Sequence, residues 1–149
     1  MRLSYAKGFI LIIGLEGKDS DDPQDPGGYT RFGICQKYNP EVDVKNLTLE
    51  QAKDIYYRKY WEPAGCNEAP YPMDICLFDG AVNPMRGGNK EILNQNPENW
   101  QEFLLLRAVR YMEHSKDIYV KGHVFRVLRL FKSINRDIQS IEKLKETGY

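Results

Sequence analysis

The sequence lacks an excess of charge of either sign. Its 149 residues carry 21 lysines and arginines against 21 aspartates and glutamates, so the formal net charge is zero. The field of the whole molecule therefore gives no reason to expect nucleic acid as a partner. The chain also lacks a run of the roughly 20 apolar residues that span a bilayer, and it contains no internal repeat or low-complexity linker. These absences favour a single domain, monomeric and without a membrane span.

Cysteine and histidine are scarce as well. Cys35, Cys66 and Cys76 are odd in number and fit no ligand or redox spacing. His114 and His123 have no cysteine or aspartate at a spacing typical of metal sites. We therefore expect unpaired thiols, no metal ion, no cofactor, and a chain that is made in a reducing cytoplasm.

The apolar run over residues 8–15 superficially resembles the core of a secretory signal peptide. It is short, no small-residue cleavage site follows it, and it ends directly in Glu16. We expect instead a first helix over residues 4–16 that is buried on most sides. The protein would then be synthesised in the cytoplasm without a cleavable signal peptide, and export would need another route.

The remaining patterns predict a mainly helical α+β protein. A hairpin is expected over residues 29–35, a helix after the capping box Thr48 to Gln51, and an apolar central helix over 73–82. Further helices are expected over 87–96, from the cap at Asn96 through Met112, and after residue 122. The aromatic group within residues 56–61 could stack on sugar rings, but aromatic stripes at helical spacing more often belong to a core.

Glu16 is the first candidate for chemistry. It ends the first helix and precedes a segment rich in aspartate, proline and glycine. The partial negative charge of a helix C-terminus and the apolar neighbours should both raise the pKa of Glu16. A carboxyl group that holds its proton near neutral pH can act as a general acid. A lone glutamate at a helix end is more often simply solvated, but Asp25 and Thr30 nearby in the sequence favour catalysis.

These three residues also carry a resemblance. Glu16, Asp25 and Thr30, with a double glycine before the threonine, resemble the Glu/Asp/Thr arrangement of phage-type lysozymes. The likeness is closer to glycoside hydrolase family 108, a family of N-acetylmuramidases first noticed as secretion activators. The matching segments are 16–17, 22–30, 33–34, 56–61 and 77–83, while Lys18 stands where that family usually has glycine.

The resemblance implies a lysozyme-like fold with a small N-terminal β-hairpin and a buried central helix. It implies one domain over 1–149, in which 1–95 carries the catalytic motif and 96–149 resembles the family's peptidoglycan domain. The implied activity is hydrolysis of the β-1,4 bond between N-acetylmuramic acid and N-acetylglucosamine in the glycan strands of the bacterial wall, reached in the periplasm. The protein would be a phage endolysin or a prophage-derived muramidase.

Glu16 would then protonate the glycosidic oxygen, while Asp25 and Thr30 place a water or stabilise the transition state. Asp25 is expected across a cleft from Glu16, at the wider carboxyl spacing that accompanies inversion. Tyr29, Asp79 and Asn83 are the candidate substrate-binding residues.

Several alternatives stay open at this point. Asp79, within an apolar helix, either forms a local hydrogen bond or points into a cleft, and Asn83 is either a helix cap or a sugar ligand. The protein itself could instead be a non-catalytic peptidoglycan-binding or secretion-accessory module. A lytic transglycosylase, which works with one glutamate, is a further alternative, although Asp25 argues against it.

Overall fold

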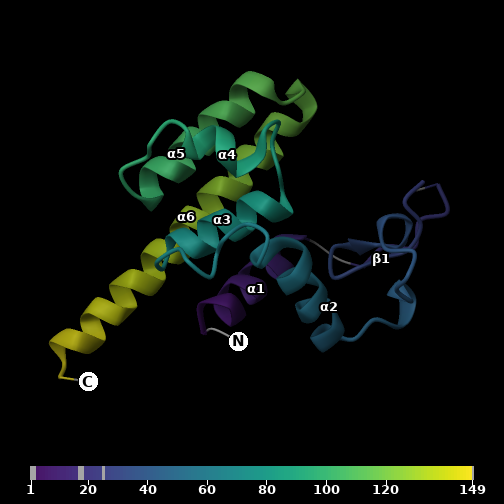
Figure 1. The fold of residues 1–149 in the computed structure, drawn as a ribbon, viewed down its shortest axis with the longest axis horizontal. Coiled ribbons are helices and arrows are strands. Elements are labelled where there is room, and N and C mark those ends of the chain that lie inside the picture. Colours follow the sequence, from purple (N-terminus) through teal and green to yellow (C-terminus); the bar gives the residue numbers. More distant parts are fainter. Residues whose placement is uncertain (1–2, 17–18, 25, 149) are drawn as a thin grey trace.

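Helices and one small hairpin make up the computed structural model, which describes residues 3–16, 19–24 and 26–148 (Figure 1). The elements are α1 (Leu3–Glu16), β1 (Thr30–Arg31), β2 (Ile34–Cys35), α2 (Leu49–Tyr56), α3 (Met73–Val82), α4 (Gly88–Leu93), α5 (Trp100–His114) and α6 (Asp117–Glu146). The mainly helical α+β class is therefore confirmed. Within the described ranges, no helix has the length and apolar character needed to cross a bilayer.

Helix α3 is the central helix, as the apolar pattern predicts. Every residue from 74 to 80 is buried, and Phe78 packs against Tyr5 of α1 with ring centroids 5.5 Å apart. Trp61 lies 5.3 Å from the same ring, in a π-helical turn (Tyr57–Trp61) that continues α2. Trp61 and Tyr56 are almost fully buried, so these two members of the 56–61 aromatic group belong to the core.

Helix α1 packs against α3 on one face only. Gly8 permits the close approach, because a Cβ atom there would lie 3.3 Å from Cδ1 of Phe78. On the opposite face, the side chains of Leu3 and Ile10 are 77% and 73% exposed. The expectation that this helix is buried on most sides is therefore wrong for that face.

The predicted hairpin is present and turns through Phe32 and Gly33. Thr30 pairs with Cys35 and Arg31 with Ile34, and both turn residues have positive φ, at 51° and 74°. Two residues of this conformation match the twist of the flanking strands. The backbone of Ser20 adds two hydrogen bonds to Thr30, of 2.9 Å and 2.8 Å, which fix the first strand from its other side.

The boundaries of the later helices differ from the prediction. The N-cap of helix α5 lies three residues after the predicted one, because Asn99, and not Asn96, accepts a hydrogen bond from the backbone of Glu102. Asn96 instead has a φ of 52°, outside helical geometry. Helix α6 begins at Asp117 and continues through Gly122, where the missing side chain costs only about 1 kcal/mol.

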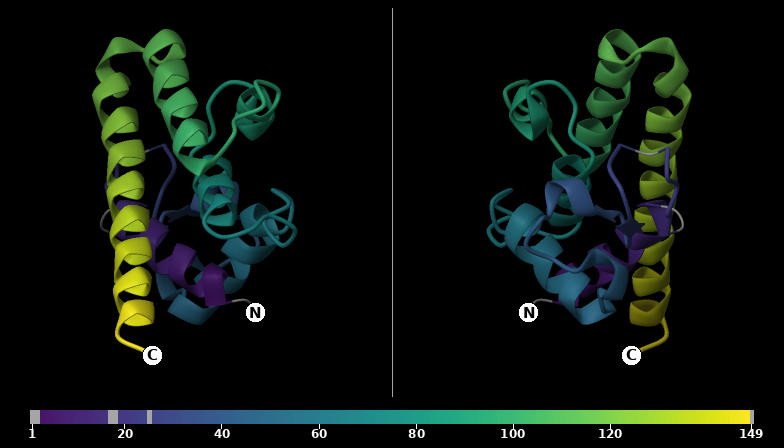
Figure 2. Two further views of the ribbon diagram at one scale, coloured as in Figure 1. Left: turned by 90° about the vertical axis from the view of Figure 1, so that its left-hand side faces the viewer. Right: turned by 90° about the vertical axis from the view of Figure 1, so that its right-hand side faces the viewer.

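Helices α5 and α6 form a long helical hairpin, and α1 lies across the C-terminal half of α6 (Figure 2). The buried stripe of α6 consists of Val127, Leu130 and Ile134, whereas Phe125 and Leu128 are about half exposed. The sequence spacing of Phe125, Leu128, Phe131 and Ile134 predicts an apolar face that shares only Ile134 with the observed buried stripe. Val127 and Leu130 belong to the buried core, which the spacing of the last helix alone does not reveal.

Candidate active site

Glu16 lies at the C-terminal end of α1, directly against the turn of the hairpin. A Cβ atom on Gly33 would lie 2.8 Å from Cγ of Glu16 and 2.5 Å from the hydroxyl of Tyr56. That hydroxyl donates a hydrogen bond of 2.8 Å to the carbonyl of Phe32, so α2 holds the turn in place. Glycine at position 33 is therefore required both by its φ and by the close approach of Glu16.

A guanidinium from the far end of the chain meets the Glu16 carboxylate. Nη1 of Arg126, on α6, donates to Oε1 of Glu16 at 2.7 Å, and the two side chains are 13% and 20% exposed. Nε of Arg126 donates to Oδ1 of Asp79 at 2.9 Å. Asp79 is fully buried, and its second oxygen accepts from Arg107 of α5 at 2.9 Å. The central helix thus holds, through Asp79, the arginine that holds Glu16.

The carboxylates of this network stabilise the charged forms of its two arginines. Burial opposes the charge of Arg107 and Arg126, but the carboxylates beside them outweigh it, so the pKa of each guanidinium is raised. Around Glu16, burial and then the charge of this carboxylate raise the pKa of the Tyr56 and Tyr60 hydroxyls. Tyr56 and Tyr60 are therefore neutral neighbours, and the ionic partner of Glu16 is Arg126.

Of the other two predicted catalytic residues, the structure describes Thr30 but not Asp25. Thr30 lies in β1, partly buried, with its backbone bonded to Ser20. Asp25 and Lys18 lie outside the described residues, so the Glu16 to Asp25 spacing stays a prediction. After position 25, the carbonyl of Gly27 accepts a hydrogen bond of 3.1 Å from the backbone of Lys37. This bond ties the double-glycine segment to the turn that follows the hairpin.

The predicted substrate-binding residues occupy different environments. Tyr29 is partly buried and packs against the core. Asp79 is 0% exposed, and both of its oxygens are bonded to arginines of other helices. The sequence alternatives for Asp79, a local bond or a cleft, therefore miss its long-range pairing, and a contact between Asp79 and substrate stays a prediction.

Asn83 lies at the end of α3, which is one of the two positions considered for it in the sequence. Its side chain donates to the hydroxyl of Tyr111 at 3.1 Å. It also lines an open cavity of about 400 Å³, together with Leu15, His123, Phe125 and Arg126. Binding of a sugar by Asn83 stays a prediction.

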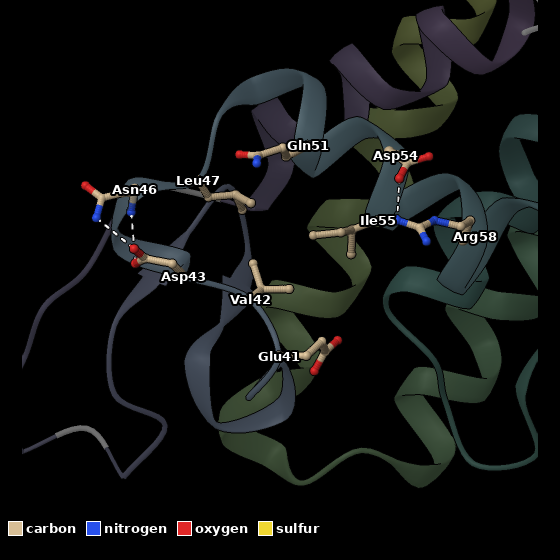
Figure 3. A pocket seen from close by; sticks show the side chains of 9 residues that line it. All are labelled: Glu41, Val42, Asp43, Asn46, Leu47, Gln51, Asp54, Ile55 and Arg58. Atoms are coloured by element: carbon tan, nitrogen blue, oxygen red, sulfur yellow. Dashed lines mark hydrogen bonds and ion pairs between the residues drawn. The ribbon is translucent and has the colours of Figure 1, made fainter.

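The cavity of about 400 Å³ is lined by Leu15, which precedes Glu16, and by Arg126, which forms an ion pair with Glu16. A second cavity of about 410 Å³ lies between α2 and the segment 41–47 (Figure 3). It is lined by none of the predicted site residues, and its polar groups bond locally, as Asp43 does with Asn46 and Asp54 with Arg58. We therefore place the candidate active site at Glu16, the hairpin turn and the Arg126 cavity.

The cysteines lie apart from this chemistry. All three are free thiols, and Cys66 and Cys76 are buried. Burial raises the pKa of Cys66 to about 12, and it raises that of Cys76 as well. In the described part of the chain, no group of three or more histidine, cysteine, aspartate or glutamate side chains is placed to hold a metal ion.

Sequence reasoning missed Arg126 and Arg107. A signal was present, because an aspartate inside a helix that is apolar nearly all round needs a cationic partner if it is buried. Arg107 and Arg126 also stand next to apolar positions of predicted helices. Nothing in the sequence, however, says which of the C-terminal cations meets residue 79.

Comparison with known proteins bears on the first half of the chain. The family model glycosyl hydrolase 108 matches residues 9–84, just over half of the sequence. The match spans Glu16, the hairpin and α3, and it ends well before Arg126. Searches with the whole chain match no curated protein and no solved structure.

Proposed function

Because the chain belongs to glycosyl hydrolase family 108, we propose that it cleaves the β-1,4 bond between N-acetylmuramic acid and N-acetylglucosamine in peptidoglycan. The observation that carries this proposal is the placement of Glu16. Its carboxylate lies at a helix end, between the hairpin turn and Arg126, and Arg126 lines an open cavity of about 400 Å³.

Arg126 gives the two oxygens of Glu16 different roles. Oε1 accepts the hydrogen bond from Nη1 of Arg126. Oε2 has no hydrogen-bond partner among the described residues, and we assign it the proton that is donated to the glycosidic oxygen. General acid assistance of this kind is worth about 10²–10⁴ in rate, and it needs the carboxyl group to be held in one orientation.

Asp25 and Thr30 would act on the other side of the sugar ring. A threonine hydroxyl is both donor and acceptor, so it can hold a water that a carboxylate deprotonates. The two backbone bonds from Ser20 fix the strand that carries Thr30. In this scheme the water attacks the anomeric carbon as the glycosidic bond breaks, and the configuration inverts.

We further propose that the protein acts as an endolysin, made in the cytoplasm of a bacterium or an infected cell and acting on the wall in the periplasm. Its partner there is the glycan strand. Residues 101–149 carry ten lysines and arginines against six aspartates and glutamates, which suits an anionic wall polymer. The family match favours a glycan over nucleic acid.

The decisive experiment follows the turbidity of purified cell walls and identifies the released products by mass spectrometry. A muramidase releases fragments with a reducing N-acetylmuramic acid end. Anhydro-sugar products would show a lytic transglycosylase instead, and wall binding without any product would show an accessory module. Either of those two results contradicts the proposal.

The matched pair of variants is Glu16→Gln and Glu142→Gln. Glutamine keeps an oxygen for Arg126 but cannot donate an acid's proton, so we expect a loss of about 10²–10⁴ in the rate of lysis. Glu142 is exposed near the end of α6, and its variant should keep full activity. Equal melting temperatures would show that both variants are folded. Activity of Glu16→Gln within a few-fold of the unmodified protein would remove Glu16 from the mechanism.

A further inference from the structure

A groove runs between α1 and α6, starting at the active site. Its first part is the cavity of about 400 Å³ beside Arg126, and its second is an adjoining cavity of about 430 Å³. Both are lined by Leu15, which directly precedes Glu16, and by Arg129. We call this continuous depression the α1–α6 groove.

The groove has an apolar floor and a basic rim. Its floor is the exposed face of α1, where Ile10 is 73% exposed and a Cβ atom on Gly14 would meet no other atom within 4 Å. Its rim is formed by Arg129, Lys132 and Arg136, which follow one face of α6 and are exposed. None of these three cationic groups forms an ion pair or a side-chain hydrogen bond within the described part of the chain.

A separate cavity that shares Ile10 and Ser133 with the groove contains an acid that is already paired. Asp137 forms an ion pair with Lys7 at 3.1 Å and accepts a hydrogen bond from the hydroxyl of Tyr71. Asp137 is therefore already neutralised by Lys7, and the rim cations upstream of it keep their charge for a ligand.

We propose that the α1–α6 groove binds the acidic stem peptide of peptidoglycan, an inference that rests on the proposed function. N-acetylmuramic acid carries this peptide on its lactyl group, so a glycan strand held at Glu16 presents it beside the reacting bond. The peptide combines small apolar residues with free carboxylates. This chemistry complements an apolar floor under a row of unpaired cations.

The dimensions agree with such an occupant. Arg126 and Arg136 are separated by ten positions of one helix, which corresponds to about 15 Å along its axis. An extended peptide of four or five residues spans about the same length. A stem peptide can thus reach from the active site to the last cation of the rim.

The test compares two substrates of the same enzyme. One is a soluble glycan that carries stem peptides, and the other is the same glycan after an amidase has removed them. In the variant Lys132→Gln/Arg136→Gln, we expect KM on the peptide-bearing glycan to rise about three- to tenfold, as for two exposed charge contacts. The kcat value, and both constants on the peptide-free glycan, should change less than twofold. The difference should shrink at high salt.

Lys143→Gln/Lys145→Gln is the matched control, because it removes the same charge from exposed positions of the same helix. Its constants should equal those of the unmodified protein on both substrates. An equal KM change on both substrates in the groove variant would overturn the inference. So would a change seen only with walls that carry phosphate polymers, or a loss of binding to anionic phosphatidylglycerol vesicles without a change in KM.

A binding measurement separates this inference from the proposed function. Calorimetry with a soluble disaccharide-tetrapeptide needs no catalysis, and the groove variant should bind it three- to tenfold more weakly than the control. If the unmodified protein released no product from either glycan, the proposed function would fail while this binding difference could still be found. If lysis were normal and the binding of the two variants equal, only the groove would be rejected.

Discussion

The segment matched by the family model and the C-terminal helical hairpin contribute differently to one site. The segment 9–84 supplies Glu16, the hairpin turn and the central helix. The helical hairpin of α5 and α6 supplies Arg107 and Arg126, which bond to Asp79 and, through Arg126, to Glu16. The motif thus indicates the carboxyl group that we propose as reactive, whereas the groups that hold it come from a region with no motif.

Of the changes that test this comparison, Arg126→Met should have the largest effect, because it removes the bonds of α6 to both Glu16 and Asp79. It leaves Glu16 without its guanidinium and a fully buried Asp79 with one arginine, and removing one partner of a buried pair costs about 3–5 kcal/mol. Urea denaturation should show that loss, and wall lysis under folding conditions should fall tenfold or more.

Two controls sharpen the result for Arg126. Lys143→Met, exposed on the same helix, should change neither stability nor lysis. Arg126→Lys keeps the charge but not the fork that reaches two carboxylates, so its stability should be intermediate. Full stability and full lysis in Arg126→Met would show that the two regions do not share a site.

Thr30→Ala tests the matched segment by itself. If its hydroxyl holds the attacking water, its loss should lower the rate of lysis by about tenfold to a hundredfold with little change in stability. Thr147→Ala, at the end of α6, is the control. NMR of the first product should show inverted anomeric configuration, and Thr30→Glu should trap a glycosyl-enzyme adduct. A retained configuration would instead make Asp25 a nucleophile.

Two glycine substitutions compare the regions directly. Gly33→Ala forces a side chain into positive φ and against Tyr56 and Glu16, so we expect a loss of about 1–3 kcal/mol. Gly122→Ala lies in α6 with no atom within 4 Å of the added Cβ. It should stabilise the protein by about 0.5–1 kcal/mol. Thermal unfolding should show a lower melting temperature for Gly33→Ala and a higher one for Gly122→Ala. Equal changes in melting temperature would contradict the tight turn at Gly33.

Chelator and reductant should have the smallest effect of all. The sequence predicts no metal ion, and the three thiols are free. EDTA and dithiothreitol should therefore leave the rate of wall lysis unchanged. Activity that EDTA destroys and zinc restores would contradict this prediction.

Sequence patterns that involve residues a few positions apart predicted the local structure correctly. The capping box at Thr48 and Gln51 is present, with the Thr48 side chain accepting from the backbone of Gln51 at 3.2 Å. The hairpin and the central helix also lie where alternation and all-round apolar character predict them. Each of these signals depends on residues a few positions apart, which is why sequence alone contains them.

Contacts between distant segments could not be predicted in the same way. Gly122 suggests the start of the last helix, but α6 begins five residues earlier, at Asp117. Asp79 requires a cation, and the sequence offers many. Which cation it meets depends on how α5 and α6 pack, and that packing follows from the whole core.

The contact between Glu16 and Arg126 joins residues 110 positions apart, which has a consequence for the order of folding. Chains fold from the N-terminus during synthesis, and contacts of long sequence separation form late. A nascent chain that has formed α1, the hairpin and α3 still lacks both cations that neutralise Asp79. The carboxyl group of Glu16, the general acid that we propose, therefore acquires its observed orientation only after α6 has docked, so we expect partly synthesised chains to be inactive.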